Sequence, residues 1–193
     1  MSFAVKMVID KVKSENITLH PGDVFVFNDP YEGGTHLSDF KMVRPFFYDD
    51  EIFCYLASVG HWHDVGGNVP GNYNPVATEG YQEGMLIPPV FLYREGVLNE
   101  DIVAILQSNS RLPGSLYGDL NGQVSTLDLG DQRLTGLLSV YGQDIVTSAL
   151  VELKQSAAKL MAIRRFWCIR YIKNTWKLEI AFRKSCWAIP TAI

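Results

Sequence analysis

The chain has 193 residues, of which 47% are hydrophobic and 20% charged, a composition typical of a globular protein with a buried core. Its net charge of −4 argues against nucleic acid as a partner, since nucleic-acid-binding domains are usually basic. No apolar run is long enough to span a bilayer, and the N-terminus lacks the pattern of a secretory signal. The three scattered cysteines, Cys54, Cys168 and Cys186, favour a reducing compartment, so we expect a cytoplasmic protein without a membrane partner.

The first part of the chain predicts one helix and three strands. Apolar residues at spacings of mostly three and four predict a helix over residues 3–13. An apolar run at 24–27 predicts a buried strand, and residues 28–39 follow as a glycine-containing loop. Two further predicted strands, at 41–47 and 52–59, flank an acidic turn, which suggests that they form a hairpin.

The rest of the chain changes from an irregular stretch to helices. Residues 60–81 hold five glycines, two prolines and three asparagines, so we expect a long binding or active-site loop there. A strand is predicted at 88–93, followed by helices that start at the N-cap Asn99, cover 116–141 and cover 145–163. Strands followed by helices indicate an α+β fold with a mixed or antiparallel sheet.

The end of the chain differs in composition from everything before it. Residues 162–193 hold seven Lys or Arg against one acid, and three of the four tryptophans. One interpretation is a basic aromatic arm for an anionic partner or a membrane surface. We favour a segment foreign to the fold, as an out-of-frame or fused end would be, because its residues follow no amphipathic order. We therefore divide the chain into a domain over 1–161 and an atypical tail over 162–193.

Side chains able to bind a metal or transfer a proton are concentrated in the loop at 28–39. Asp29, Glu32, His36 and Asp39 lie within eleven positions of one another. His36 and Asp39, three residues apart across a turn, are able to point the same way. Imidazole nitrogen together with carboxylate oxygen suits Zn²⁺, Mn²⁺ or Fe²⁺, and no cysteine lies near enough to suggest a structural zinc site.

A second cluster follows the third predicted strand. His61 and His63 are two residues apart and so lie on one face of the strand end, and Asp64 is spaced to orient a ligating imidazole. His36, Asp39 and either His61 or His63 would supply three ligands and leave a position open for water or substrate. A histidine at a strand end is more often a structural residue, so the residues alone leave a metal site and a structural role evenly balanced.

Three acids are candidate catalytic groups: Asp29, Asp64 and Glu79. Glu79 lies in the long loop, where it is equally suited to be a ligand, a general base or a solvated charge, and we favour a solvated charge for Glu83. The sequence contains no Walker-type phosphate loop, no dinucleotide fingerprint and no nucleophile elbow. We therefore expect that this chain does not itself bind ATP.

Several long motifs of this sequence resemble the hydantoinase B/oxoprolinase family. They are GDVFVFNDPYEGGTHLSD at 22–39, ASVGHWHDVGG at 57–67, NVPG at 68–71 and EGYQEGMLIPPV at 79–90. The resemblance runs from about Phe3 to about Lys159. The family includes the B subunits of ATP-dependent hydantoinases, the C-terminal half of 5-oxoprolinase and the alpha subunits of acetone and acetophenone carboxylases. The NDP triplet and the His-Trp pair resemble the hydantoinase and carboxylase branches more closely than 5-oxoprolinase.

The resemblance implies a catalytic subunit that works beside an ATP-using partner of the hydantoinase A type. That partner would activate a small cyclic amide or ketone by phosphorylation, and the B-type subunit would complete ring opening or carboxylation at a divalent metal. In the carboxylase branch the metal ligands fall on His36, Asp39 and His61 of this sequence. The family's remaining carboxylate ligand lies upstream of the first residue of this chain.

Family members are usually several hundred residues long, so we expect an internal fragment of a larger domain with a truncated or frameshifted end. The leading hypothesis is a metal-dependent catalytic subunit of an ATP-dependent cyclic-amide hydrolase, such as an N-methylhydantoinase or a 5-oxoprolinase-type enzyme. The alternatives are a fragment like the alpha subunit of an ATP-dependent ketone carboxylase, and a truncated interaction module without catalysis.

Overall fold

The computed structural model describes residues 2–31 and 36–175, with side chains up to Met161. Two compact units divide between Ser139 and Val140, and each is considered by itself. Residues 176–193 of the predicted tail lie outside the described residues, as does Glu32.

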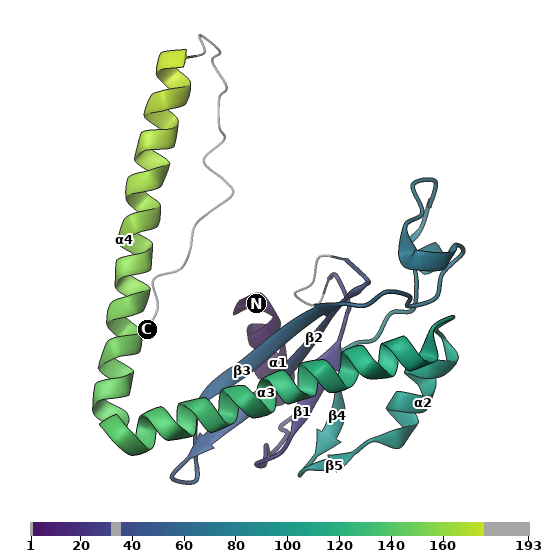
Figure 1. The fold of residues 1–193 in the computed structure, drawn as a ribbon, viewed down its shortest axis with the longest axis horizontal. Helices are drawn as coiled ribbons and strands as arrows, with labels where there is room; N and C mark the ends of the chain where they lie inside the picture. The colour runs from purple at the N-terminus through teal and green to yellow at the C-terminus, as the bar shows by residue number, and fades with distance from the viewer. Residues whose placement is uncertain (1, 32–35, 176–193) are drawn as a thin grey trace. The chain divides into compact units, whose positions relative to one another are not determined.

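A five-stranded antiparallel sheet forms the centre of the first unit (Figure 1). Its strands are β1 (Val24–Phe27), β2 (Asp39–Tyr48), β3 (Glu51–His61), β4 (Val90–Arg94) and β5 (Val97–Leu98). They lie in the order β3-β2-β1-β4-β5, and each neighbouring pair is antiparallel. The predicted hairpin of β2 and β3 is confirmed, and the structure decides for an antiparallel rather than a mixed sheet.

Tight turns set the register of both hairpins. Asp49 and Asp50 connect β2 to β3 with φ values of 49° and 63°, and Glu95 and Gly96 connect β4 to β5 with 52° and 80°. Two consecutive residues with positive φ make the kind of turn that matches the right-handed twist of the flanking strands. In the longer hairpin this register makes Asp39 the cross-strand partner of His61.

Helices cover both faces of the sheet, which explains why all four residues of β1 are buried. On one face, Ala4 and Val8 of α1 (Ser2–Ser14) pack against Phe25 and Phe27. The other face carries Val24 and Val26, together with α2 (Glu100–Ser108) and α3 (Pro113–Tyr141) (Figure 1). These two helices contribute Val103, Leu106, Leu116, Leu120 and Leu127 to the core. Alternate residues of a strand point to opposite faces, so burying both faces requires the continuous apolar run that predicted this strand.

The predicted helices are all present, with boundaries that differ by a few residues. Asn99 caps α2 as expected, because its side-chain oxygen accepts a hydrogen bond from the Ile102 amide at 3.3 Å. The helices α1 and α3 cover the predicted ranges. In the second unit α4 (Gln143–Thr175) begins two residues before the predicted start at 145 and ends twelve residues after the predicted end at 163.

The long predicted loop is also confirmed, and it contains only two single 3-10 turns, η1 (Pro70–Asn72) and η2 (Gly80–Gln82). Its start differs from the prediction, because β3 continues two residues beyond Val59 and ends at His61. His61 therefore belongs to the sheet and not to the loop. Across the described residues, no single helix is both long enough and apolar enough to cross a membrane, although α3 and α4 together pass that test by length and composition.

Candidate functional site

The ends of β2 and β3 bring together the three residues predicted to bind a metal. Asp39 starts β2 and His61 ends β3, and the Nδ1 atom of His61 lies 2.8 Å from the Oδ1 atom of Asp39. His36 approaches from the preceding loop, with its Nδ1 atom 3.0 Å from the other carboxylate oxygen, Oδ2. One carboxylate therefore links two imidazoles that are 25 positions apart in the sequence.

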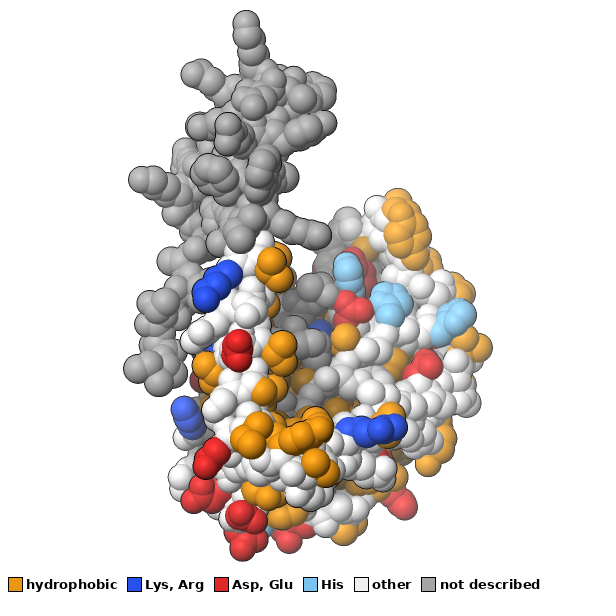
Figure 2. Space-filling model, turned by 60° about the vertical axis from the view of Figure 1, so that its left-hand side comes forward, with side chains coloured by type: hydrophobic (Ala, Val, Ile, Leu, Met, Phe, Trp, Pro, Cys, Tyr) orange, Lys and Arg blue, Asp and Glu red, His pale blue; other side chains and the backbone are white. Residues whose placement is uncertain are grey.

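This cluster lies at the surface. The side chains of His36 and His61 are 75% and 68% exposed, whereas that of Asp39 is 17% exposed. The two rings are nearly perpendicular, with centroids 6.4 Å apart. Figure 2 shows imidazoles beside carboxylates on one face of the molecule. Both imidazoles are thus open to solvent, whereas the carboxylate between them is mostly buried.

The donor set of this cluster fits a divalent metal in its chemistry but is not assembled around one point. Imidazole nitrogens and a carboxylate are the ligands that Zn²⁺, Mn²⁺ and Fe²⁺ accept. In the part of the chain that the structure describes, no group of three or more His, Cys, Asp or Glu side chains is arranged to hold a metal ion. Each imidazole instead faces its own oxygen of Asp39.

The structure distinguishes between the two histidines that the sequence left open. His61 contacts Asp39, whereas His63 lies in the loop after β3 with an exposed side chain. The carbonyl of His63 accepts a hydrogen bond from Asn72 at 3.4 Å. Between the two histidines, Trp62 points into the core and is 1% exposed.

Trp62 fixes the end of β3 against the sheet and against α3. Its ring stacks on Phe40 with the centroids 3.8 Å apart and the planes 2° from parallel. Its Nε1–H donates to Oε1 of Gln123 at 2.7 Å, and Nε2 of Gln123 donates to the carbonyl of Phe40 at 3.0 Å. Phe40 follows Asp39 and Trp62 follows His61, so this contact holds the inner side of the candidate site.

Asn28 holds the two ends of the loop that carries His36. Its side-chain nitrogen donates to the carbonyls of Leu37 and Met85 at 2.7 and 2.8 Å, and its oxygen accepts from the amide of Ile87 at 2.7 Å. Asn28 is fully buried, and these bonds satisfy its amide group. The first residue of the NDP triplet thus has a structural role.

Asp29 and Lys41 lie close to the cluster. The Oδ1 atom of Asp29 accepts a hydrogen bond from the amide of Tyr31 at 2.8 Å, a local turn typical of aspartate. Lys41 is 3% exposed, and its Nζ lies 3.5 Å from the Asn28 carbonyl. Burial lowers the pKa of Lys41, while the negative charges of Asp39 and Asp29 act in the opposite direction. The sequence did not predict a role for this lysine, because a charged residue in an apolar strand does not by itself show which groups surround it in the fold.

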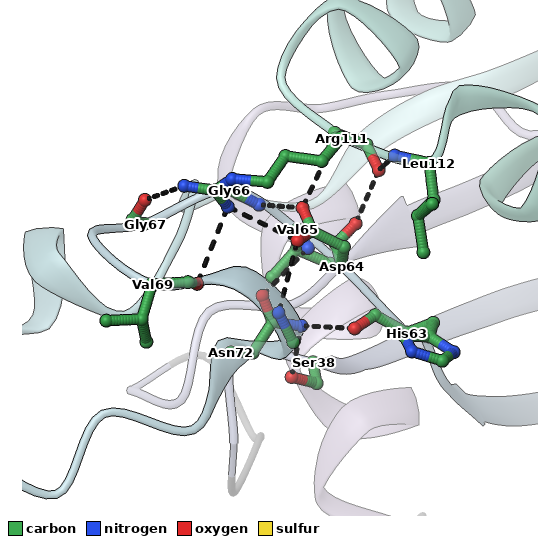
Figure 3. Close-up of polar contacts among 12 residues, drawn as sticks. Ser38, His63, Asp64, Val65, Gly66, Gly67, Val69, Asn72, Arg111 and Leu112 are labelled. Carbon is green, nitrogen blue, oxygen red and sulfur yellow. Dashed lines mark hydrogen bonds and ion pairs between the residues drawn. The ribbon is translucent and has the colours of Figure 1, made fainter.

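Asp64 is the centre of a hydrogen-bond network that organises the loop after β3 (Figure 3). Its Oδ1 atom accepts from the amides of Gly66 and Arg111, both at 3.1 Å. Its Oδ2 atom accepts from the amide of Gly71 at 3.3 Å and from the Arg111 guanidinium at 3.2 Å. Arg111 also donates to the carbonyl of Gly67 at 2.7 Å.

These donors decide the charge state of Asp64. Burial by itself would raise its pKa, but the backbone amides and the guanidinium of Arg111 together hold the pKa of this carboxyl below its ordinary value. The carboxylate thus holds a glycine-rich loop and the α2–α3 connection, and an orienting role towards an imidazole stays a prediction. The sequence offered no signal for Arg111, which is 47 positions away.

A cavity of about 500 Å³ lies beside the loop that leads to His36. Leu37, the neighbour of His36, lines it together with Glu79, one of the predicted catalytic acids. The remaining lining residues are Pro30, Tyr31, Ala77, Thr78, Gly80, Tyr81, Glu83, Gly84 and Leu86. The cavity therefore joins the two motif-bearing loops and presents carboxylate, hydroxyl and apolar groups to a small molecule.

Comparison with known proteins gives a consistent result. A family model described as hydantoinase B/oxoprolinase matches residues 1–175. This match extends beyond the segment, about 3–159, over which the motifs indicated a resemblance. The predicted domain boundary at residue 161 stays a prediction.

Two of the relatives are named as enzyme subunits. The caprolactamase subunit beta of Pseudomonas jessenii is 41% identical over 140 residues, which are 72% of this chain and 24% of that protein. A crystal structure of the ATP-dependent caprolactamase from the same organism superposes with a TM-score of 0.75 at 36% identity, over 83% of this chain and 28% of that one. The acetophenone carboxylase delta subunit of Aromatoleum aromaticum is 27% identical over 79% of this chain and 22% of that protein, where the resemblance had implied an alpha subunit.

The chain spans about a quarter of the length of these relatives. Within that quarter, the long motifs and the family match indicate the same family, and the fold superposes on that of the caprolactamase. The chain belongs to the hydantoinase B/oxoprolinase family.

Proposed function

We propose that this chain carries the metal-binding part of the catalytic subunit of an ATP-dependent cyclic-amide hydrolase of the hydantoinase or oxoprolinase type. The observation that carries the proposal is the pairing of His36 and His61 with the two oxygens of Asp39. Leu37, the residue after His36, lines a cavity that is large enough for a small molecule. A relative that is a caprolactamase supports a cyclic amide as the substrate class.

His36, Asp39 and His61 would hold a divalent metal, with Mn²⁺, Zn²⁺ or Fe²⁺ as the candidates. Both imidazoles are largely exposed, so they are able to turn towards a shared cation without disturbing the core. When bound, such an ion supplies Lewis-acid polarisation of a carbonyl and activation of water. This chain's residues orient that site through the sheet register, which fixes Asp39 opposite His61.

The acids of the region divide into two roles. Asp29 and Glu79 are the groups that we propose for proton transfer, because Asp29 precedes Pro30 and Tyr31 of the cavity wall and Glu79 itself lines the cavity. Asp64 is buried among four donors, so we assign it to holding the loop in place. ATP would be used by a partner subunit of the hydantoinase A type, which activates the substrate.

Ketone carboxylation is the second candidate, favoured by the relationship to an acetophenone carboxylase subunit. The same ligand set would then stabilise an enolate-like intermediate of the ketone. The two candidates differ in what is consumed, since only the carboxylase consumes bicarbonate. Assays of the complete enzyme with a lactam and with a ketone plus labelled bicarbonate distinguish them.

Metal analysis of the purified full chain tests the site. After incubation with Mn²⁺, Zn²⁺ or Fe²⁺ and removal of excess metal, we expect His36→Ala and Asp39→Ala to abolish binding. His63→Ala serves as the matched control. It should weaken metal binding less, because the hydrogen bond to Asp39 at this strand end is made by the His61 ring, whereas His63 bonds Asn72 through its backbone carbonyl.

Two results would contradict this expectation. Equal losses at His61→Ala and His63→Ala would show that the wrong imidazole was chosen. Less than about a tenth of an equivalent of metal in the unmodified chain would favour a non-catalytic interaction module over a metal site.

A further inference from the structure

We infer that Asn72 is a positioning residue for His36, Asp39 and His61, an inference that rests on the proposed function. Asn72 lies in the glycine-rich loop, and the sequence alone did not predict a role for it. Its side chain reaches from this loop to both of the chain segments that carry the candidate ligands (Figure 3).

The amide group of Asn72 uses both of its ends. Its Nδ2 atom donates to the hydroxyl of Ser38 at 3.0 Å and lies 3.4 Å from the carbonyls of Trp62 and His63. Its Oδ1 atom accepts from the amide of Val65 at 2.9 Å. The side chain thus provides hydrogen-bond partners for backbone groups of Trp62, His63 and Val65, just after the end of β3.

The contacted residues are the direct neighbours of the candidate ligands. Ser38 precedes Asp39 and is 5% exposed, and Trp62 follows His61 and is 1% exposed. The Trp62 amide also donates to the Ser38 carbonyl at 2.8 Å. Asn72 therefore contacts the neighbours of Asp39 and His61, in addition to the contacts that Gln123 makes with Phe40 and Trp62.

The backbone explains why this position favours asparagine. Asn72 has a φ of 59°, a left-handed conformation that asparagine and glycine adopt more readily than other residues. Glycine would keep the backbone but provide no amide group. Aspartate would keep an acceptor for the Val65 amide but lose the donor that faces Ser38 and two carbonyls.

Asn72 is itself fixed by the network around Asp64. The preceding residue, Gly71, donates its amide to Asp64, which also accepts from Arg111 in the α2–α3 connection. Asn72 follows Gly71 in the chain and donates to Ser38, so the Asp64 network fixes the backbone that carries the Asn72 side chain. Loss of the Asn72 side chain would leave the Ser38 hydroxyl and the Val65 amide without these partners and loosen the strand ends that carry Asp39 and His61.

The test compares Asn72→Gly with Asn74→Gly, a matched change in the same loop. The Asn74 side chain accepts only a local hydrogen bond from the Val76 amide among the contacts described, so its loss leaves the strand ends untouched. For Asn72→Gly we expect about a tenfold weaker Mn²⁺ affinity by calorimetry, because partners that orient metal ligands typically contribute 10- to 100-fold. We also expect faster hydrogen exchange of the Trp62 amide in the metal-free chain.

Ser38→Ala tests independently whether Asn72 acts on the candidate ligands through the Ser38 hydroxyl. If Asn72 acts through the Ser38 hydroxyl, the effects of Asn72→Gly and Ser38→Ala on Mn²⁺ affinity should be clearly less than additive. Full additivity would overturn this route.

The two readouts separate this inference from the metal proposal. Faster Trp62 exchange without Mn²⁺ binding in any variant would refute the metal site and keep the positioning role. Unchanged exchange and unchanged affinity in Asn72→Gly would overturn the positioning role, and so would equal changes in Asn74→Gly.

Discussion

At the scale of single residues, the loop after β3 depends on one buried charge. The side chain of Asp64 is 2% exposed, yet its carboxylate accepts four hydrogen bonds. Three come from backbone amides and one comes from the guanidinium of Arg111. A buried charge costs stability unless its partners compensate for the loss of water. Here the partners more than compensate, since they lower the pKa of this carboxyl despite its burial.

Replacement of Asp64 by asparagine should remove a contribution to stability that depends on pH. The folded pKa lies below that of the unfolded chain, about 3.9 for an aspartate. The contribution is therefore fully present above the unfolded pKa and is lost as pH falls through the folded pKa. At neutral pH we expect Asp64→Asn to lower the free energy of unfolding by about 2–3 kcal/mol, the usual cost of hydrogen bonds to a charged group.

The measurement is a series of urea unfolding curves between neutral and acid pH. The difference between the unmodified chain and Asp64→Asn should shrink as the pH falls below about 4. A difference that stays constant over that range would mean that the charge of Asp64 has no part in stability.

At the scale of elements, the packing of β3 on α3 leaves no room for one methyl group. A Cβ atom at Gly60 would lie 2.7 Å from the side chain of Gln123. Gln123 bonds both Trp62 and Phe40, so its displacement would break the contact that holds the inner side of the site. Gly60 is thus required by a close approach of two elements and not by its backbone conformation.

Gly60→Ala should therefore destabilise the first unit, by about 1–3 kcal/mol if the Gln123 side chain has to move. This corresponds to a fall of roughly 2–4 °C in the midpoint of thermal unfolding for each kcal/mol in a chain of this size. Gly80→Ala is the control, because a Cβ atom there meets nothing within 4 Å. Calorimetric melts of the two variants decide the matter, and equal melting points would show that Gln123 adapts at no cost.

At the scale of the whole chain, the two units differ in how they are stabilised. The first unit has core residues on both faces of its sheet. In α4, the side chains from Thr147 to Met161 are exposed, including the apolar side chains of Leu150, Leu153 and Leu160. The predicted helix is present, but along this stretch it does not contribute a buried core.

Removal of residues 162–193 should consequently leave the unfolding of the first unit nearly unchanged. The stretch of α4 that precedes this segment, from Thr147 to Met161, has exposed side chains and contributes nothing to the buried core. We expect the melting temperature of the 1–161 chain to stay within about 2 °C of the original, a shift that corresponds to under 1 kcal/mol. A fall of several degrees in a calorimetric melt would show that these residues stabilise the fold.

The local pattern of the sequence determined the elements of this protein and the identity of its candidate ligands. These patterns act over neighbouring residues and need no knowledge of the fold. Apolar spacing predicted α1, an acidic turn between two apolar runs predicted the hairpin of β2 and β3, and Asn99 before a helical pattern predicted the cap of α2. The family motifs placed metal roles on His36, Asp39 and His61, and whether they bind a metal stays a prediction.

Tertiary structure decided what lies around these residues. The register of the hairpin selected His61 over His63 as the partner of Asp39, because β3 ends at His61, directly opposite Asp39, and His63 lies in the loop beyond the strand. Arg111 and Gln123 meet Asp64 and Trp62 across 47 and 61 positions. Contacts over such distances depend on how the helices pack on the sheet, and no local pattern in the sequence encodes them.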